Sequence, residues 1–145
     1  EANQVNTKPI LNITAENFAK YGKVLEFSKD FEGVFEILVK HPPSDGWRLA
    51  LLRHSQKTGR VMERHPASLE TFEPLTGMLL MIVAAHETPE DFEVFLLDKP
   101  VCLHMGVWHQ VISLAAESQV KIVENYEVDS EYYELKNDIS AALIY

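Results

Sequence analysis

Four side chains in this sequence have the types and spacing of a metal site: Glu63, His65, Glu70 and His109. In an extended strand, residues i and i+2 point to the same face, so Glu63 and His65 can meet one ligand while Arg64 points away. Burying both glutamates requires a cation, either a metal or an arginine. A mixed set of nitrogen and oxygen donors suits a divalent transition metal, and we expect an ion of the nickel, zinc or manganese class. The alternative is that His65 is a polar strand residue with other partners and that Glu63 and Glu70 are solvated strand residues.

A second group of candidate site residues surrounds His109. His104 lies five residues before it, with Gly106 between them. In a regular strand this odd spacing sends the two rings to opposite faces, whereas a bulge at the glycine brings both inside. We predict that His104 transfers protons and that His109 is catalytic as well as a ligand; the alternative for His104 is a surface histidine. Trp108 is predicted to line the substrate pocket or to pack in the core.

Arg53 and Arg64 are the predicted substrate-binding arginines. A guanidinium offers the two-pronged donor geometry that a carboxylate needs, so a small-molecule carboxylate is the expected substrate. Because Arg64 alternates with Glu63 and His65, it also fits a structural position that faces solvent or a partner subunit.

Turn residues separate short apolar segments along most of the chain. Several short strands with turns between them indicate an antiparallel barrel or sandwich. Thr14 is a good N-cap and predicts a short helix from Ala15 to Tyr21, which Gly22 closes in the left-handed conformation. Helices are expected only near the two ends. The expected strands are Trp47 to Arg53, Met78 to Ala85, Phe92 to Leu97, one or two between Val101 and Leu114, and Gln119 to Tyr126.

Length and composition predict a single domain over residues 1–145, because no linker, repeat or low-complexity segment divides the chain. A formal net charge of −9 argues against nucleic acid or an anionic membrane as partner. Cys102, the one cysteine, lies in an apolar run and is predicted to be a buried, inert thiol. The longest apolar run, Met78 to Ala85, is too short to span a bilayer, and we expect a cytoplasmic protein.

Four segments, taken together and in this order, resemble the ureidoglycolate lyase family, formerly called ureidoglycolate hydrolase, within the cupin superfamily. They are Phe18 to Leu25, Glu63 to Pro66, Phe72 to Pro74, and His104 to His109. The resemblance implies a cupin double-stranded β-helix, which is an antiparallel β-barrel, with short terminal helices. The pattern from Gly106 to His109 fits the second cupin motif and favours His109 as a ligand, while Glu63 stands where cupins usually carry a histidine.

The resemblance also implies an activity, the cleavage of ureidoglycolate to glyoxylate and urea. We expect the protein to be a homodimer. Arg53 resembles an arginine on the equivalent strand of the family and is expected to hold the substrate carboxylate. A divalent metal is expected to lower the pKa of the substrate hydroxyl, with His104 moving the proton. Two alternatives stay open. One is a metal-dependent cupin isomerase or oxygenase acting on another small hydroxy or keto acid, and the other is a non-catalytic cupin that binds a small ligand.

Overall fold

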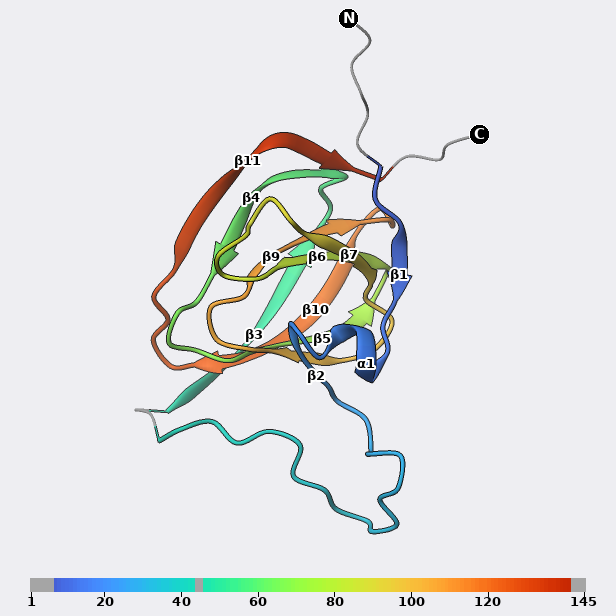
Figure 1. Ribbon diagram of the computed structural model, residues 1–145, viewed down its shortest axis with the longest axis vertical. Helices are drawn as coiled ribbons and strands as arrows, with labels where there is room; N and C mark the ends of the chain where they lie inside the picture. Colours follow the sequence, from blue (N-terminus) through green and yellow to red (C-terminus); the bar gives the residue numbers. More distant parts are fainter. Residues whose placement is uncertain (1–6, 44–45, 142–145) are drawn as a thin grey trace, which may run out of the picture.

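The short apolar segments fold into eleven β-strands and one short helix in the computed structural model, which describes residues 7–43 and 46–141 (Figure 1). In chain order they are β1 (Ile10–Asn12), α1 (Ala15–Phe18), β2 (Gly22–Val24), β3 (Trp47–His54), β4 (Thr58–Arg64), β5 (Glu70–Thr76), β6 (Leu79–Ala84), β7 (Glu93–Leu96), β8 (Val101–Leu103), β9 (Trp108–Ser113), β10 (Ser118–Asn125) and β11 (Glu131–Ser140). No helix among the described residues has the length and hydropathy needed to cross a membrane.

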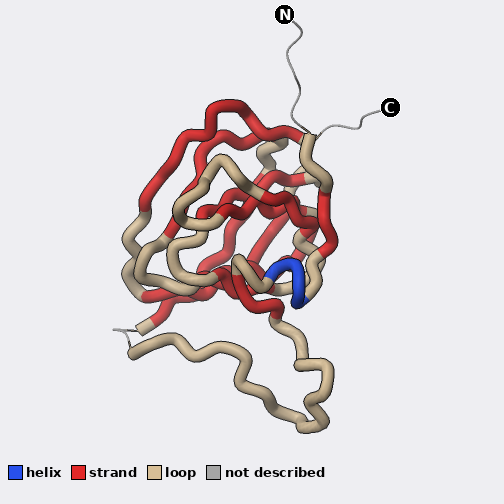
Figure 2. The backbone as a smooth tube through the Cα atoms, viewed as in Figure 1, coloured by secondary structure: helices blue, strands red, loops and turns tan. Residues whose placement is uncertain are grey.

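The strands form two sheets. The first has the order β1-β7-β6-β9-β4-β11 and the second β2-β8-β5-β10-β3. The described strands pair antiparallel except β1 and β7, which run parallel. The strands surround a common interior, while a long loop between β2 and β3 extends away from one end (Figure 2). The predicted all-β class is therefore confirmed.

The first sheet lies between two layers of apolar side chains. Along β6, side chains alternate between the layers because successive residues of a strand point to opposite faces. Leu79 and Met81 belong to the core cluster between the two sheets, while Leu80 and Ile82 belong to a second cluster on the outer face. All six residues of β6 are buried, so the predicted buried central strand is confirmed. Cys102 is likewise buried in β8, and burial raises the pKa of its thiol to about 11.

The two ends differ from the expected helices. The helix after Thr14 ends at Phe18, and Gly22 is not left-handed but begins β2. Glycine is needed there because an added Cβ would collide with the backbone carbonyl of Cys102 in the paired strand β8. The C-terminal segment forms β11 instead of a helix, and it pairs with β4 at the edge of the first sheet. Residues 142–145 lie outside the described part of the chain.

Replacing Gly22 with alanine is expected to destabilise the protein by roughly 1–3 kcal/mol, because the methyl group meets rigid backbone. Gly59→Ala is the matched control on another strand. There the added Cβ meets the end of the Gln110 side chain, which can turn away, so the loss should be smaller. Chemical denaturation of both variants measures the difference, and equal losses would contradict the close β2–β8 approach.

Candidate metal centre

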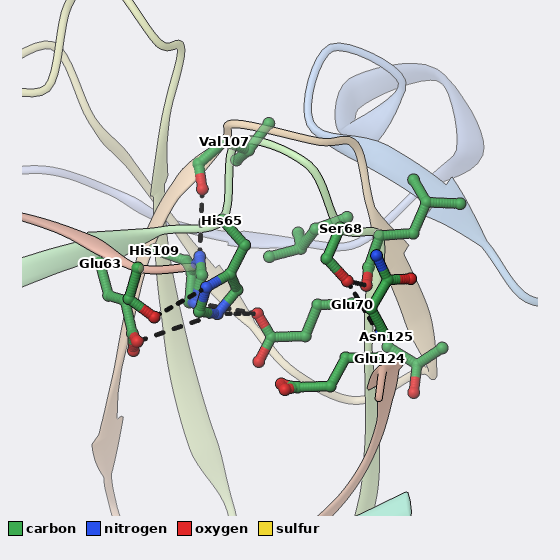
Figure 3. A network of polar contacts seen from close by, with 12 residues as sticks. Glu63, His65, Ser68, Glu70, Val107, His109, Glu124 and Asn125 are labelled. Carbon is green, nitrogen blue, oxygen red and sulfur yellow. Dashed lines mark hydrogen bonds and ion pairs between the residues drawn. The ribbon is translucent and has the colours of Figure 1, made fainter. Parts of the chain in front are cut away.

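Two imidazoles and a carboxylate, contributed by two strands and by the residue that follows a third, meet between the sheets (Figure 3). His65 follows the last residue of β4, Glu70 begins β5, and His109 lies in β9. The Nε2 atoms of His65 and His109 lie 3.0 and 3.1 Å from the same oxygen, Oε2 of Glu70. Glu63 pairs with His109 across β4 and β9, and its Oε1 lies 3.9 Å from Nε2 of His65. The predicted convergence of these four side chains is present in the structure.

Backbone carbonyls fix the orientation of both rings. Nδ1 of His109 lies 3.1 Å from the carbonyl oxygen of Val107, and Nδ1 of His65 lies 3.2 Å from that of Asp129. A carbonyl oxygen only accepts, so each Nδ1 carries the hydrogen and donates it. In the neutral rings each Nε2 then presents a lone pair to the cluster. This is the arrangement usual for histidines that bind a metal.

The buried Glu70 carboxylate requires a positive charge next to it. Its Oε2 is buried and has no assigned hydrogen-bond donor, although two ring nitrogens lie beside it. Burial alone would raise the pKa of Glu70, but His109 and His65 outweigh it and lower the pKa to about 2. For His65, burial alone would lower the pKa. Its contacts with Glu70 and then Glu63 outweigh burial, so the pKa of His65 is raised. An ionised carboxylate facing two lone pairs is stable only with a proton or a metal ion between them.

The donor set fits a divalent metal ion. Adjacent donors that bind one ion at about 2.1 Å lie roughly 3 Å apart, which is the spacing of Glu70 from the two rings. Two overlapping groups have their donor atoms within 4.8 Å of one another: Glu63 with His65 and His109, and His65 with Glu70 and Glu124. The fit therefore rests on the geometry and chemistry of these side chains, and it does not select one metal.

Glu124 was not predicted from the sequence, although it belongs to the cluster. It lies in β10 directly opposite Glu70, and its side chain is only 8% exposed. On its other side it pairs with Arg48 of β3. A signal was present in the sequence, because Val120, Ile122 and Glu124 share the inward face of one strand. A charged residue that continues an apolar face marks a buried polar site.

A pocket of about 440 Å³ leads to the cluster between β3 and β4. Glu63, Glu70 and His109 lie in its wall. Apolar side chains of the barrel interior, Leu52 and Phe72 among them, form much of the rest. Apolar walls with a few converging polar groups are typical of a small-molecule site.

Residues 46–141, about two thirds of the chain, match the family model described as ureidoglycolate lyase. This span contains the whole cluster. The chain belongs to the ureidoglycolate lyase family. The predicted family is thereby confirmed. A search of curated proteins finds no match.

Solved structures with a similar fold include oxalate decarboxylase from Bacillus subtilis. One, described for its Mn(II) centres, aligns with a TM-score of 0.43 and 16% identity, covering 66% of this chain and 24% of that chain. A mutant of the same enzyme aligns with a TM-score of 0.44 and 17% identity, covering 62% and 24%. This chain spans about a quarter of the length of these structures, and such distant alignments assign no function.

Arg53 does not reach the cluster, contrary to the sequence-based expectation. Its side chain is 72% exposed and pairs with Glu117 at 3.2 Å. Its neighbours on β3, Leu52 and His54, line the pocket instead. Because side chains alternate along a strand, Arg53 must lie on the opposite, outer face.

Arg64 and Trp108 lie on the other face of the first sheet from the pocket. Nη2 of Arg64 is 2.6 Å from Glu131, and its guanidinium stacks on the Trp108 ring at 5.2 Å. Trp108 is buried in the outer apolar cluster, and its Nε1 donates to the carbonyl of His86. The geometry therefore gives neither residue a contact with a substrate in the pocket and supports a structural role for both.

His104 lies outside the cluster. Its side chain is exposed, and Nε2 lies 3.0 Å from the carbonyl oxygen of Ala19. Gly106, with a φ of 78°, forms a turn between β8 and β9 and not a bulge within one strand. The turn separates His104 from His109, so the geometry supports the surface alternative for His104 and gives it no contact with a substrate in the pocket.

Proposed function

We propose that this member of the family cleaves ureidoglycolate to glyoxylate and urea at the cluster of His65, Glu70 and His109. The observation that carries the proposal is the buried Glu70 carboxylate held between two inward-facing imidazole nitrogens. This site lies in the wall of a pocket large enough for a small carboxylic acid. Membership of a lyase family supports the same chemistry.

His65, Glu70 and His109 are the residues that would hold a divalent ion. When bound, such an ion lowers the pKa of a coordinated hydroxyl and stabilises the oxyanion that forms. The carbonyls of Val107 and Asp129 keep the two rings in the ligating tautomer. The metal itself is left to measurement, since the same donors accept nickel, zinc or manganese.

Glu63 is the group that we propose takes and returns the proton. It is the more exposed of the two pocket carboxylates, with 36% of its side chain accessible, and it stands farther from His65 than Glu70 does. The substrate hydroxyl gives its proton to Glu63 as the aldehyde carbonyl forms and the carbon–nitrogen bond breaks. The bonding pair goes to the leaving nitrogen, which takes the proton back and departs as urea.

A product assay tests the proposal. Purified protein of known metal content is incubated with each enantiomer of ureidoglycolate, and glyoxylate and urea are quantified separately. We expect equal amounts of the two products from one enantiomer. Metal retention without turnover would favour a cupin isomerase or oxygenase for another hydroxy or keto acid. Neither metal nor turnover would leave only a ligand-binding protein.

We also propose that the chain forms a homodimer through the outer face of β3. Trp47, Leu49 and Leu51 are 68%, 54% and 68% exposed on this strand, which is the edge of its sheet. Side chains of both charges lie beside this strand. They form two ion pairs, Arg53 with Glu117 and Lys121 with Glu73. An apolar patch bordered by both charges can meet its own copy across a two-fold axis.

The double variant Leu49→Lys with Leu51→Lys is expected to be monomeric, because it places charges in the proposed interface. Leu114→Lys is the control, since Leu114 is also exposed but lies beyond β9. Light scattering should give twice the chain mass for the wild type and the control. A wild-type mass of one chain would contradict the proposal.

A further inference from the structure

Arg48 is the arginine of this chain that lies beside the cluster. It sits in β3 directly opposite Glu124, which in turn lies directly opposite Glu70 in β5. Residues that face each other across neighbouring strands share a face of the sheet, so all three side chains project into the interior. The other three arginines pair with carboxylates outside the cluster. They are Arg53 with Glu117, Arg60 with Glu134 and Asp138, and Arg64 with Glu131.

Within the described part of the chain, the contact with Glu124 leaves one end of the Arg48 guanidinium without a partner. Nε and Nη2 both donate to the same oxygen, Oε2 of Glu124, at 3.2 and 2.9 Å. A guanidinium has five N–H groups, so three of them remain, two on Nη1 and one on Nη2. Among the described residues, Glu124 is the acceptor of the hydrogen bonds that this side chain donates. The remaining groups form the end-on fork that fits a second carboxylate.

The Arg48–Glu124 pair lies between solvent and the cluster. The Arg48 side chain is 50% exposed, whereas that of Glu124 is 8% exposed. The Glu124 carboxylate is in turn within 4.8 Å of donor atoms of His65 and Glu70. Glu124, which Figure 3 shows beside Glu70, therefore links the Arg48 guanidinium to the metal-binding side chains.

Charge favours the same role. Glu63, Glu70 and Glu124 bring three carboxylates together, and an anionic substrate would be repelled by them. Arg48 supplies a positive charge on the solvent side of these carboxylates. Glu124 fixes the direction of the guanidinium, so less rotamer freedom is lost when a ligand binds.

We propose that Arg48 binds the substrate carboxylate and that Glu124 is the residue that positions it. The inference rests on the proposed function, and it narrows the substrate class to small acids with an oxygen function on the carbon next to the carboxylate. In this arrangement the carboxylate sits on Arg48 and the carbinol carbon faces His65, Glu70 and His109.

Variants of two arginines on one strand test the assignment. Arg48→Gln is expected to raise the KM for ureidoglycolate about tenfold or more and to change kcat less, since the contact exists in both ground and transition states. Arg48→Lys should recover only part of this loss, because an ammonium lacks the fork. Arg53→Gln, whose side chain lies on the outer face, should leave KM and kcat within about twofold.

A double variant distinguishes two possible roles of Arg48, which are binding of the substrate and neutralisation of the negative charge of Glu124. If Arg48 only balanced the buried carboxylate, adding Glu124→Gln to Arg48→Gln would restore the KM, because no unpaired charge would remain. If Arg48 binds substrate, the KM stays high in the double variant. Restoration of the wild-type KM, or an unchanged KM in Arg48→Gln, would overturn the assignment.

Calorimetry with glyoxylate keeps this test independent of turnover. The metal-loaded wild type and the Arg53 variant should bind glyoxylate, and Arg48→Gln should bind it at least about tenfold more weakly. If ureidoglycolate is not turned over but this difference is seen, the proposed function fails and the carboxylate site stands. If turnover is seen and all three proteins bind alike, the carboxylate site fails and the function stands. No binding and no turnover would overturn both.

Discussion

Replacing His109 with alanine is expected to lower the rate of glyoxylate release by at least about a hundredfold, in the range of a lost positioned catalytic group. The residue supplies one of the two ring nitrogens on Glu70, at 3.1 Å. Its loss also leaves a buried carboxylate with a single imidazole partner, so metal affinity should fall by more than the ten- to hundredfold usual for an outer-shell change. Metal content and initial rates measured on the same sample test both effects.

His104→Ala is the matched control for this variant. His104 was the residue predicted to transfer protons, yet its ring is exposed and contacts the carbonyl of Ala19. Its removal should change the rate less than about threefold, in line with a surface position. Circular dichroism should show both variants folded, and His109→Gln, which better preserves side-chain volume, can replace His109→Ala if that variant is unstable. A large loss in His104→Ala with none at His109 would contradict the site.

Glu70→Gln is expected to lose metal affinity, whereas Glu63→Gln is expected to lose catalytic rate. Glu70→Gln should lose at least about a hundredfold in metal affinity, because it removes the anionic donor that both rings share. The metal-free variant should be as stable as the metal-free wild type or more so. The amide NH2 of glutamine can donate to the two ring lone pairs, so no cation is needed to hold the site together.

Glu63→Gln should keep the metal and lose about a hundredfold or more in rate, as expected for removal of the proton acceptor. The Glu63 carboxylate is farther from His65, at 3.9 Å, and is partly exposed, so replacing it should weaken metal binding less. Equilibrium dialysis against a competing chelator gives the metal affinities, and product release gives the rates. If Glu63→Gln loses the metal as fully as Glu70→Gln, Glu63 is a ligand, as first predicted from the sequence, and the proton acceptor lies elsewhere.

The central side chains could be predicted because strand geometry links them locally. Two residues two apart on one strand share a face, which placed Glu63 with His65. The family pattern added His109. Both relations survive in the structure, where Glu63 and His109 pair across β4 and β9.

Arg53 was expected at the site because it resembles an arginine on the equivalent strand of the family, but this side chain lies on the outer face of β3. This outer face carries Trp47, Leu49 and Leu51, all exposed, while the inner face carries Arg48. Apolar alternation alone therefore points to the wrong face as the interior. The inward direction follows only from pairing with β10, a contact between segments far apart in the sequence.

The C-terminal strand was missed for a related reason. β11 is an edge strand with mostly exposed side chains, so it lacks the apolar alternation by which strands are recognised. Of its ten residues only Leu135 is fully buried, within the outer apolar cluster. The pairing partner β4 therefore determines this element more than its own sequence does.

A metal titration tests the central claim most directly. Protein stripped of metal is titrated with one divalent ion at a time, and bound metal and ureidoglycolate cleavage are followed in the same samples. Our account predicts that at least one ion restores glyoxylate release in proportion to the metal bound, with a plateau at about one equivalent per chain, and that His109→Ala shows no such rise. Full activity in the stripped protein, or no glyoxylate at any loading with any ion, would contradict it.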